Sequence, residues 1–167
     1  MDKGLRNSLL TVCSLLSKHK VEYLVVGGTA VALHGYFRMS VSLAGIPTDK
    51  PDLDFWYNPS YKNYFKLLDA IEALGEDVSA FKNETTPNPK KSFFKLNFDT
   101  FTIDFLPELP GLSKFRNSYE NKEVVQVEGV DIMFINFDDV ITNKQEVARE
   151  KDITDIHELM KRRKNEP

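Results

Sequence analysis

Cysteine is almost absent from this sequence, since Cys13 is the only one among 167 residues. A single cysteine excludes a disulfide within the chain, and we therefore expect a reducing, cytoplasmic location. Cys13 falls within an apolar helical pattern, so a packed structural thiol is expected in preference to a reactive one.

Long apolar runs and an excess of positive charge are also missing. The first residues, MDKGLRNSLL, contain no long apolar core and no small-residue cleavage site, so we expect neither a signal peptide nor a membrane span. The net charge of −3 provides no overall basic field, which argues against strong nonspecific binding of nucleic acid.

The composition that remains is that of a globular protein. Hydrophobic residues make up 41% of the chain and charged residues 28%, which excludes intrinsic disorder. A chain of this length favours one domain, residues 1–167, with a core at about 21–135 and a charged, helical C-terminal part at about 137–164.

Apolar periodicity predicts alternating helices and strands. In the first half we expect a helix at 4–19, a buried strand at 23–26, a helix after Gly27-Gly28 at 29–37, a loop at 38–51, a strand at 52–57 and a helix at 61–75 that stops at Gly75. Asn58 is expected to cap that helix, with Pro59 at its first position. In the second half we expect a polar loop at 82–92, a hairpin of 93–98 and 101–106, and a second strand pair around Glu128-Gly129.

Two carboxylates stand out in the stretch DLDFWY. Side chains two residues apart on a strand point to the same face, so Asp52 and Asp54 project together and Leu53 projects to the other side. Their repulsion is relieved best by a divalent metal, and hard oxygen ligands suit Mg²⁺ or Mn²⁺. A turn or a solvated strand edge is the plainer interpretation of this pair.

Asp104 is a third candidate, because it lies alone within the apolar strand pattern FTIDFLPEL. If this strand runs beside DLDFWY, the three carboxylates could hold two metals roughly 3.5–4 Å apart, as nucleotidyl transfer uses. A structural, paired acid is the alternative for Asp104 alone.

A glycine pair lies between the first strand and the next helix. Gly27 and Gly28 allow backbone N–H groups to approach a phosphate closely, and the Thr29 hydroxyl could add a hydrogen bond. A plain tight turn would give the same short pattern.

Together, Gly27-Gly28, Asp52-Leu53-Asp54 and Asp104 resemble the signature of the nucleotidyltransferase superfamily, which shares its fold with DNA polymerase β. The runs GGTAVALHGYFR and NKQEVAREKDITDIHEL are similar to motifs of a small bacterial group that includes AbiEii-type toxins and minimal nucleotidyltransferases. The resemblance extends from about Val21 to Leu159. It implies an α/β (α+β) fold with a mixed, twisted sheet of about 4–6 strands flanked by helices, followed by C-terminal helices.

The resemblance also implies an activity: metal-dependent transfer of a nucleoside monophosphate from an NTP to an acceptor, which could be RNA, a protein or a small molecule. A toxin-antitoxin or phage-defence setting, with an antitoxin or other partner protein, is implied as well. The alternative is a catalytically silent module that binds a nucleotide or a protein partner. One departure from the family is the 23-residue spacing between Gly28 and Asp52, which predicts either a lid or a surface loop.

Further residues have both a functional and a structural interpretation. The resemblance makes Lys144 a possible phosphate contact, against an ion pair on a solvated helix, and Asp152 and Asp155 are expected to orient basic groups. Arg38 could face the phosphates or simply lie at the surface. His34 is expected to be packed. Trp56 and Tyr57 could stack on a base or pack in the core. The Lys90-Lys91 pair is expected to be solvated.

Overall fold

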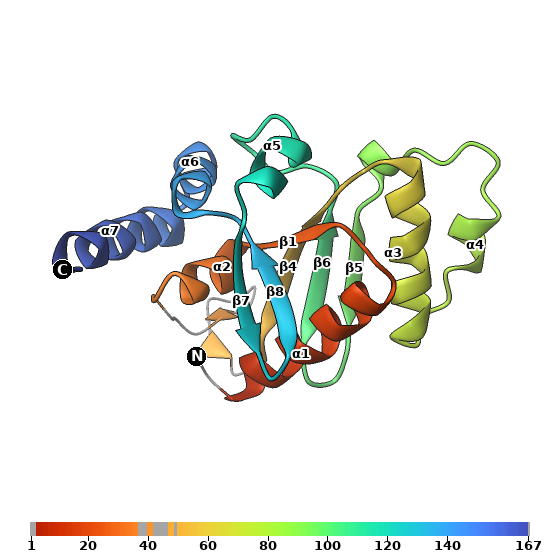
Figure 1. Ribbon diagram of the computed structural model, residues 1–167, viewed down its shortest axis with the longest axis horizontal. Coiled ribbons are helices and arrows are strands. Elements are labelled where there is room, and N and C mark those ends of the chain that lie inside the picture. Colours follow the sequence, from red (N-terminus) through yellow and green to blue (C-terminus); the bar gives the residue numbers. More distant parts are fainter. Residues whose placement is uncertain (1–2, 37–39, 42–46, 49, 167) are drawn as a thin grey trace.

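The computed structural model describes residues 3–36, 40–41, 47–48 and 50–166, and its centre is a mixed sheet of six strands (Figure 1). The strand order is β5-β6-β4-β1-β8-β7. The strands are β1 (Tyr23–Val26), β4 (Asp52–Tyr57), β5 (Phe94–Asn97), β6 (Thr102–Leu106), β7 (Glu123–Val127) and β8 (Val130–Phe134). The predicted α/β class, the strands at 23–26 and 52–57 and both hairpins are confirmed.

Helices surround this sheet. They are α1 (Lys3–Lys18), α2 (Gly27–Leu33), α3 (Tyr61–Ala73), α4 (Ser79–Lys82), α5 (Phe115–Glu120), α6 (Phe137–Val147) and α7 (Glu150–Asn165), with a short 3-10 helix, η1 (Pro89–Lys91). In Figure 1, α6 and α7 lie at the opposite end of the molecule from α3 and α4. No helix in the described ranges is both long and apolar enough to cross a membrane.

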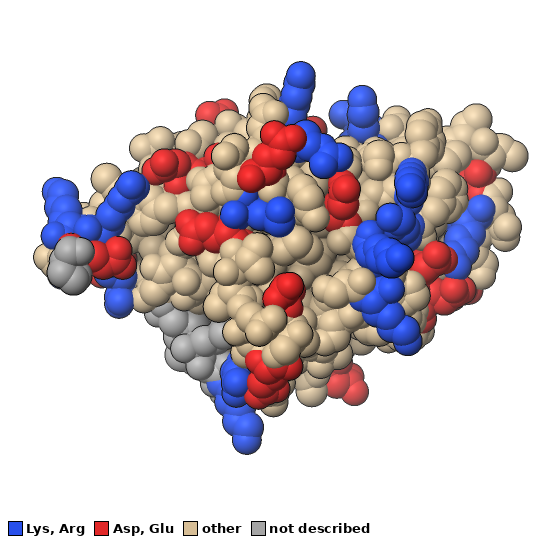
Figure 2. Space-filling model, in the orientation of Figure 1, with Lys and Arg blue, Asp and Glu red and all other residues tan. Residues whose placement is uncertain are grey.

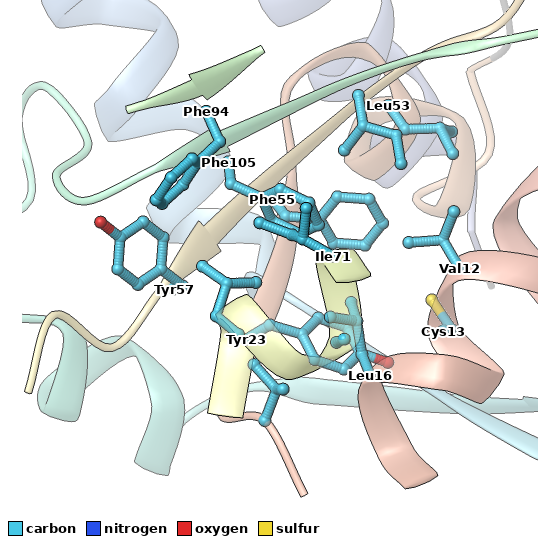
Figure 3. Close-up of a cluster of buried hydrophobic side chains, with 14 of the residues drawn as sticks. Val12, Cys13, Leu16, Tyr23, Leu53, Phe55, Tyr57, Ile71, Phe94 and Phe105 are labelled. Carbon is cyan, nitrogen blue, oxygen red and sulfur yellow. The ribbon is translucent and has the colours of Figure 1, made fainter. Parts of the chain in front are cut away.

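The alternation of side chains along the strands divides the core into two clusters. On one face Tyr23, Leu53 and Phe105 pack with α1 and α3, and Figure 3 shows part of this cluster. Cys13 belongs to it, and burial raises the pKa of its thiol to about 12, as suits a packed structural cysteine. On the other face Trp56 packs in a cluster that includes residues of α2, α5, α6 and α7. Asp52, Asp54 and Asp104 belong to this second face.

Several local predictions were wrong. Helix α2 begins at Gly27, not at residue 29, and Ser60 caps α3, since its side chain accepts from the Asn63 N–H. Asn58 instead binds Glu22, donating to Oε2 over 2.6 Å. The segment expected to be a loop at 38–51 contains two short paired strands, β2 (Ser40–Val41) and β3 (Pro47–Thr48).

The C-terminal part is helical as predicted, but it consists of two helices. Ala148 at the end of α6 takes a left-handed conformation with φ of 51°, which separates α6 from α7. Helix α5 was not predicted. Gly75, with φ of 103°, follows the end of α3, where the helix was expected to stop.

The charged residues visible in Figure 2 include both signs. Basic side chains gather over α3 on this face, and acidic and basic groups alternate elsewhere on it. Outside the basic group over α3, this view shows no surface dominated by one charge.

Candidate active site

The three aspartates come together because β4 and β6 pair in parallel. Asp54 lies directly opposite Asp104, and Asp52 lies opposite Thr102. Residues paired across strands project to the same face, and so do residues two apart on one strand. The register therefore places all three carboxylates on one face of the sheet.

Gly27 approaches this group from the neighbouring strand. Strand β1 pairs with β4 so that Val26 lies opposite Asp54, and Gly27 then turns into α2 with a φ of 63°. A Cβ atom at this position would lie 2.2 Å from Asp54 Oδ2. The turn thus requires glycine both for its backbone conformation and for its closeness to the carboxylate.

Thr29 does not point its hydroxyl at open space. It is buried, and its Oγ1 donates to the main-chain oxygen of Asp52 over 3.5 Å. This hydrogen bond therefore connects α2 to β4. The backbone of Gly27 and Gly28 remains the better candidate for contact with a phosphate.

Repulsion and burial make Asp54 hard to ionise. Burial, followed by the charges of Asp52 and Asp104, raises its pKa to about 7. Burial also raises the pKa of Asp104, while nearby Lys95 acts to lower it. Both carboxylates would therefore gain from additional positive charge on this face.

Asp52 and Asp104 differ in the groups that surround their carboxylates. Asp52 is exposed, and the Thr102 hydroxyl donates to its Oδ1. Asp104 is mostly enclosed, and its Oδ1 is buried without a hydrogen bond, although Lys95 Nζ lies 3.6 Å away. An oxygen in this condition is suited to accept a ligand that the chain itself does not supply.

A divalent cation fits these residues in part. Among the described residues, no three His, Cys, Asp or Glu side chains are grouped closely enough to hold a metal ion. The opposed pair Asp54 and Asp104, with its mutual repulsion and an unsatisfied oxygen, has the hard donor chemistry that Mg²⁺ and Mn²⁺ require. Asp52 could join them if its carboxylate turned away from Thr102.

Lys144 is enclosed by the protein and is not exposed as a residue that contacts phosphate would be. Its side chain is 3% exposed, and its Nζ lies 2.8 Å from Asp152 Oδ1 and 3.0 Å from Asp155 Oδ2. Arg149 also binds Asp152, with its Nε 2.6 Å from Oδ2. The two aspartates thus hold basic groups, as expected, and Lys144 is enclosed between them.

Four basic residues act on the aspartates, and the sequence interpretation missed one of them, Lys95. Lys144 and Lys151 of the tail both act to lower the pKa of Asp54, and Asp54 contributes to the raised pKa of Arg149 after the larger effect of its Asp152 hydrogen bond. Arg149 and Lys151 are exposed where Lys144 is buried. The run REKD shows the spacing of Arg149 and Lys151 in the sequence, but whether their side chains face β4 depends on the corner between α6 and α7. Lys95 could have been found from the alternation around buried Phe94.

The remaining candidates lie away from the acids or within the core. His34 is packed as predicted: its Nε2 lies 2.9 Å from the Ile135 carbonyl oxygen, and its ring contacts Phe134 and Phe137 edge-on. Trp56 and Tyr57 are buried, which leaves neither ring free to stack on a base. Lys90 and Lys91 are exposed in η1, and Arg38 lies outside the described residues.

Comparisons with known proteins agree with this geometry. A family model described as nucleotidyl transferase of unknown function (DUF2204) matches residues 5–166. No curated protein matches the chain.

Two solved structures share the fold. A candidate nucleotidyltransferase from Thermotoga maritima is 16% identical with a TM-score of 0.56, and the match covers 94% of this chain and 92% of that one. An antigenic nucleotidyltransferase-like protein from Paracoccidioides brasiliensis is 12% identical with a TM-score of 0.50, covering 95% of this chain and 75% of that one. Because the family match extends over nearly the whole sequence, the chain belongs to the nucleotidyl transferase family of unknown function and has the fold of the nucleotidyltransferase superfamily.

Proposed function

We propose that this protein transfers a nucleoside monophosphate from an NTP to a nucleophilic acceptor with the help of Mg²⁺ or Mn²⁺. The observation that carries the proposal is the pairing of Asp54 with Asp104 on one sheet face, directly beside the close turn at Gly27. Family membership supports the same reaction class.

Each part of the chain has a role in this proposal. Asp52, Asp54 and Asp104 hold the divalent cation, which when bound offsets the negative charge of the triphosphate. The backbone of Gly27 and Gly28 carries the β- and γ-phosphates, with Thr29 supporting their turn. Arg149 and Lys151 supply exposed positive charge, and buried Lys144 holds the corner that presents them.

The reaction forms a bond between the acceptor oxygen and the α-phosphorus and breaks the bond to pyrophosphate, which leaves. Asp104 accepts the proton of the acceptor hydroxyl on a carboxylate oxygen.

Incubation with α-³²P-labelled NTPs, Mg²⁺ or Mn²⁺, and RNA, protein or small-molecule acceptors tests the proposal. We expect label on one acceptor class, and we expect Asp54→Asn and Asp104→Asn to abolish the transfer. The matched control is Asp99→Asn in the exposed turn before β6, which should transfer normally. Transfer that survives both active-site changes would rule out these acids.

A second candidate is a silent module that binds a nucleotide or a protein partner. Two observations favour it. The Thr102 hydroxyl donates to Asp52 Oδ1, and among the described residues no three carboxylate, histidine or cysteine side chains are grouped closely enough to hold a metal ion. NTP binding without label transfer to any acceptor would favour it. The resemblance to AbiEii-type toxins further suggests an antitoxin partner in the cytoplasm, which co-purification from the native cell would detect.

A further inference from the structure

Lys95 lies at the outer side of the acidic group. It belongs to β5, an edge strand of the sheet, and its cross-strand partner on β6 is Asp104. Its Nζ is 3.6 Å from Asp104 Oδ1, the oxygen that is buried without a hydrogen bond. An ammonium at this distance offsets the charge of the carboxylate but does not donate a hydrogen bond to its Oδ1.

The two partners differ strongly in exposure. The Lys95 side chain is 64% exposed and the Asp104 side chain 17%. The lysine can therefore leave into solvent at little cost, because exposed ion pairs contribute weakly to stability. Asp104 cannot follow, since β4 and β5 enclose its strand on both sides.

We propose that Lys95 is a built-in counter-cation for Asp104, and that a divalent ion binding to the acids displaces the Lys95 ammonium. The inference rests on the metal dependence proposed above. Lys95 and the divalent ion carry like charge and share one carboxylate, so each weakens the binding of the other.

Displacement gives Lys95 a position in the reaction. Gly27 lies on the β1 side of Asp54, whereas Lys95 lies on the opposite side of Asp104. In-line transfer separates the leaving pyrophosphate and the attacking group on opposite sides of the phosphorus. A pyrophosphate held near Gly27 therefore places the acceptor on the β5 side, where the released ammonium would meet it.

Mn²⁺ titration followed by electron paramagnetic resonance tests the competition without requiring activity. Removing the competing charge with Lys95→Met should tighten Mn²⁺ binding about two- to fivefold. Lys95→Arg keeps the charge and should remain near wild type, as should Lys91→Met at an exposed lysine of η1. Unchanged or weaker binding in Lys95→Met overturns the inference.

A second measurement tests the ion pair in EDTA, where no metal contributes. Thermal unfolding of Lys95→Met, Asp104→Asn and the double variant should show non-additive effects on the midpoint. Additive effects would overturn the inference even if Mn²⁺ binds. If wild type and Asp104→Asn bind Mn²⁺ equally, the proposed metal site itself fails, which is a different result from equal binding by wild type and Lys95→Met.

Discussion

Asp54 experiences burial and two like charges at once, which gives it a measurable effect on stability. Its folded pKa of about 7 lies above its unfolded value, so the native state binds more protons between about pH 4 and 7. Raising the pH through this window therefore lowers the stability of the metal-free protein. Asp54→Asn removes the charge, and we expect it to raise the free energy of unfolding by about 4 kcal/mol at pH 8.

The same change should have a much smaller effect at pH 4.5, where the native Asp54 is already protonated. Urea unfolding in EDTA at both pH values measures the difference. Asp99→Asn, in an exposed turn, serves as the control and should alter neither value. A gain of equal size at both pH values would show that charge is not the cause.

Gly27 is constrained twice, by its positive φ and by its distance to Asp54. Gly27→Ala should destabilise the protein by about 2–3 kcal/mol, since it combines backbone strain with displacement of the carboxylate. Gly129→Ala is the matched control: its φ is 79°, but no atom lies within 4 Å of the added carbon. It should therefore cost only the strain, about 1 kcal/mol.

Thermal unfolding and nucleotide binding should separate these two glycines. Gly129→Ala is expected to bind NTP normally, whereas Gly27→Ala should lose binding because its turn and Asp54 both move. Equal losses in stability for the two variants would contradict the contact argument.

At the scale of elements, the α6–α7 corner depends on Lys144. Burial acts to raise the pKa of Asp152, but hydrogen bonds from Arg149 and Lys144 outweigh it and lower the pKa to about 2. Lys144→Met would leave Asp155 and part of Asp152 buried without their ammonium partner. We expect a loss of about 3–5 kcal/mol in the free energy of unfolding, measured in urea.

Lys151→Met provides the contrast within the same corner. Lys151 is exposed on α7, so its removal should leave stability within about 0.5 kcal/mol of wild type and weaken NTP binding. If Lys144→Met folds normally and only nucleotide affinity falls, Lys144 contacts phosphate directly, as the family resemblance implied.

Local patterns explain which elements the sequence could predict. The continuous apolar run at Tyr23–Val26 and the alternation at Asp52–Leu53–Asp54 both indicate strands by themselves. Ser60 caps α3 in place of the predicted Asn58, because Asn58 binds Glu22 in the folded chain. Helix α5 is six residues long, which is too short for a helical period to be recognised.

The sequence predicts a shared face for two of the acids, whereas the surroundings of the basic residues depend on the folded chain. The spacing of Asp52 and Asp54 fixes their common face locally, whereas their distance to Asp104 depends on the parallel pairing of β4 and β6. The difference between enclosed Lys144 and exposed Lys151 likewise arises from the left-handed turn at Ala148. Neither the pairing nor the turn has a local sequence signal as strong as the strand period.

At the scale of the whole molecule, the acidic face joins segments that are distant in the sequence. The carboxylates of β4 and β6 are affected by three other parts of the chain. Gly27 lies against Asp54, Lys95 lies close to Asp104, and basic residues of the α6–α7 corner act on the pKa of Asp54. Only the folded chain brings them together, so a ligand of this face binds the native state in preference to the unfolded one. Ligand binding and global stability should therefore be coupled.

We expect Mn²⁺ with a non-hydrolysable NTP analogue, at 100 times their dissociation constants, to stabilise the protein by about 2.7 kcal/mol. For a chain of this size that corresponds to an increase of roughly 5–10 °C in Tm. The increase should be absent in Asp54→Asn and in EDTA, because the first removes a proposed ligand and the second removes the metal. An equal increase in Asp54→Asn would place the binding elsewhere, and no increase in wild type would contradict the proposed site as a whole.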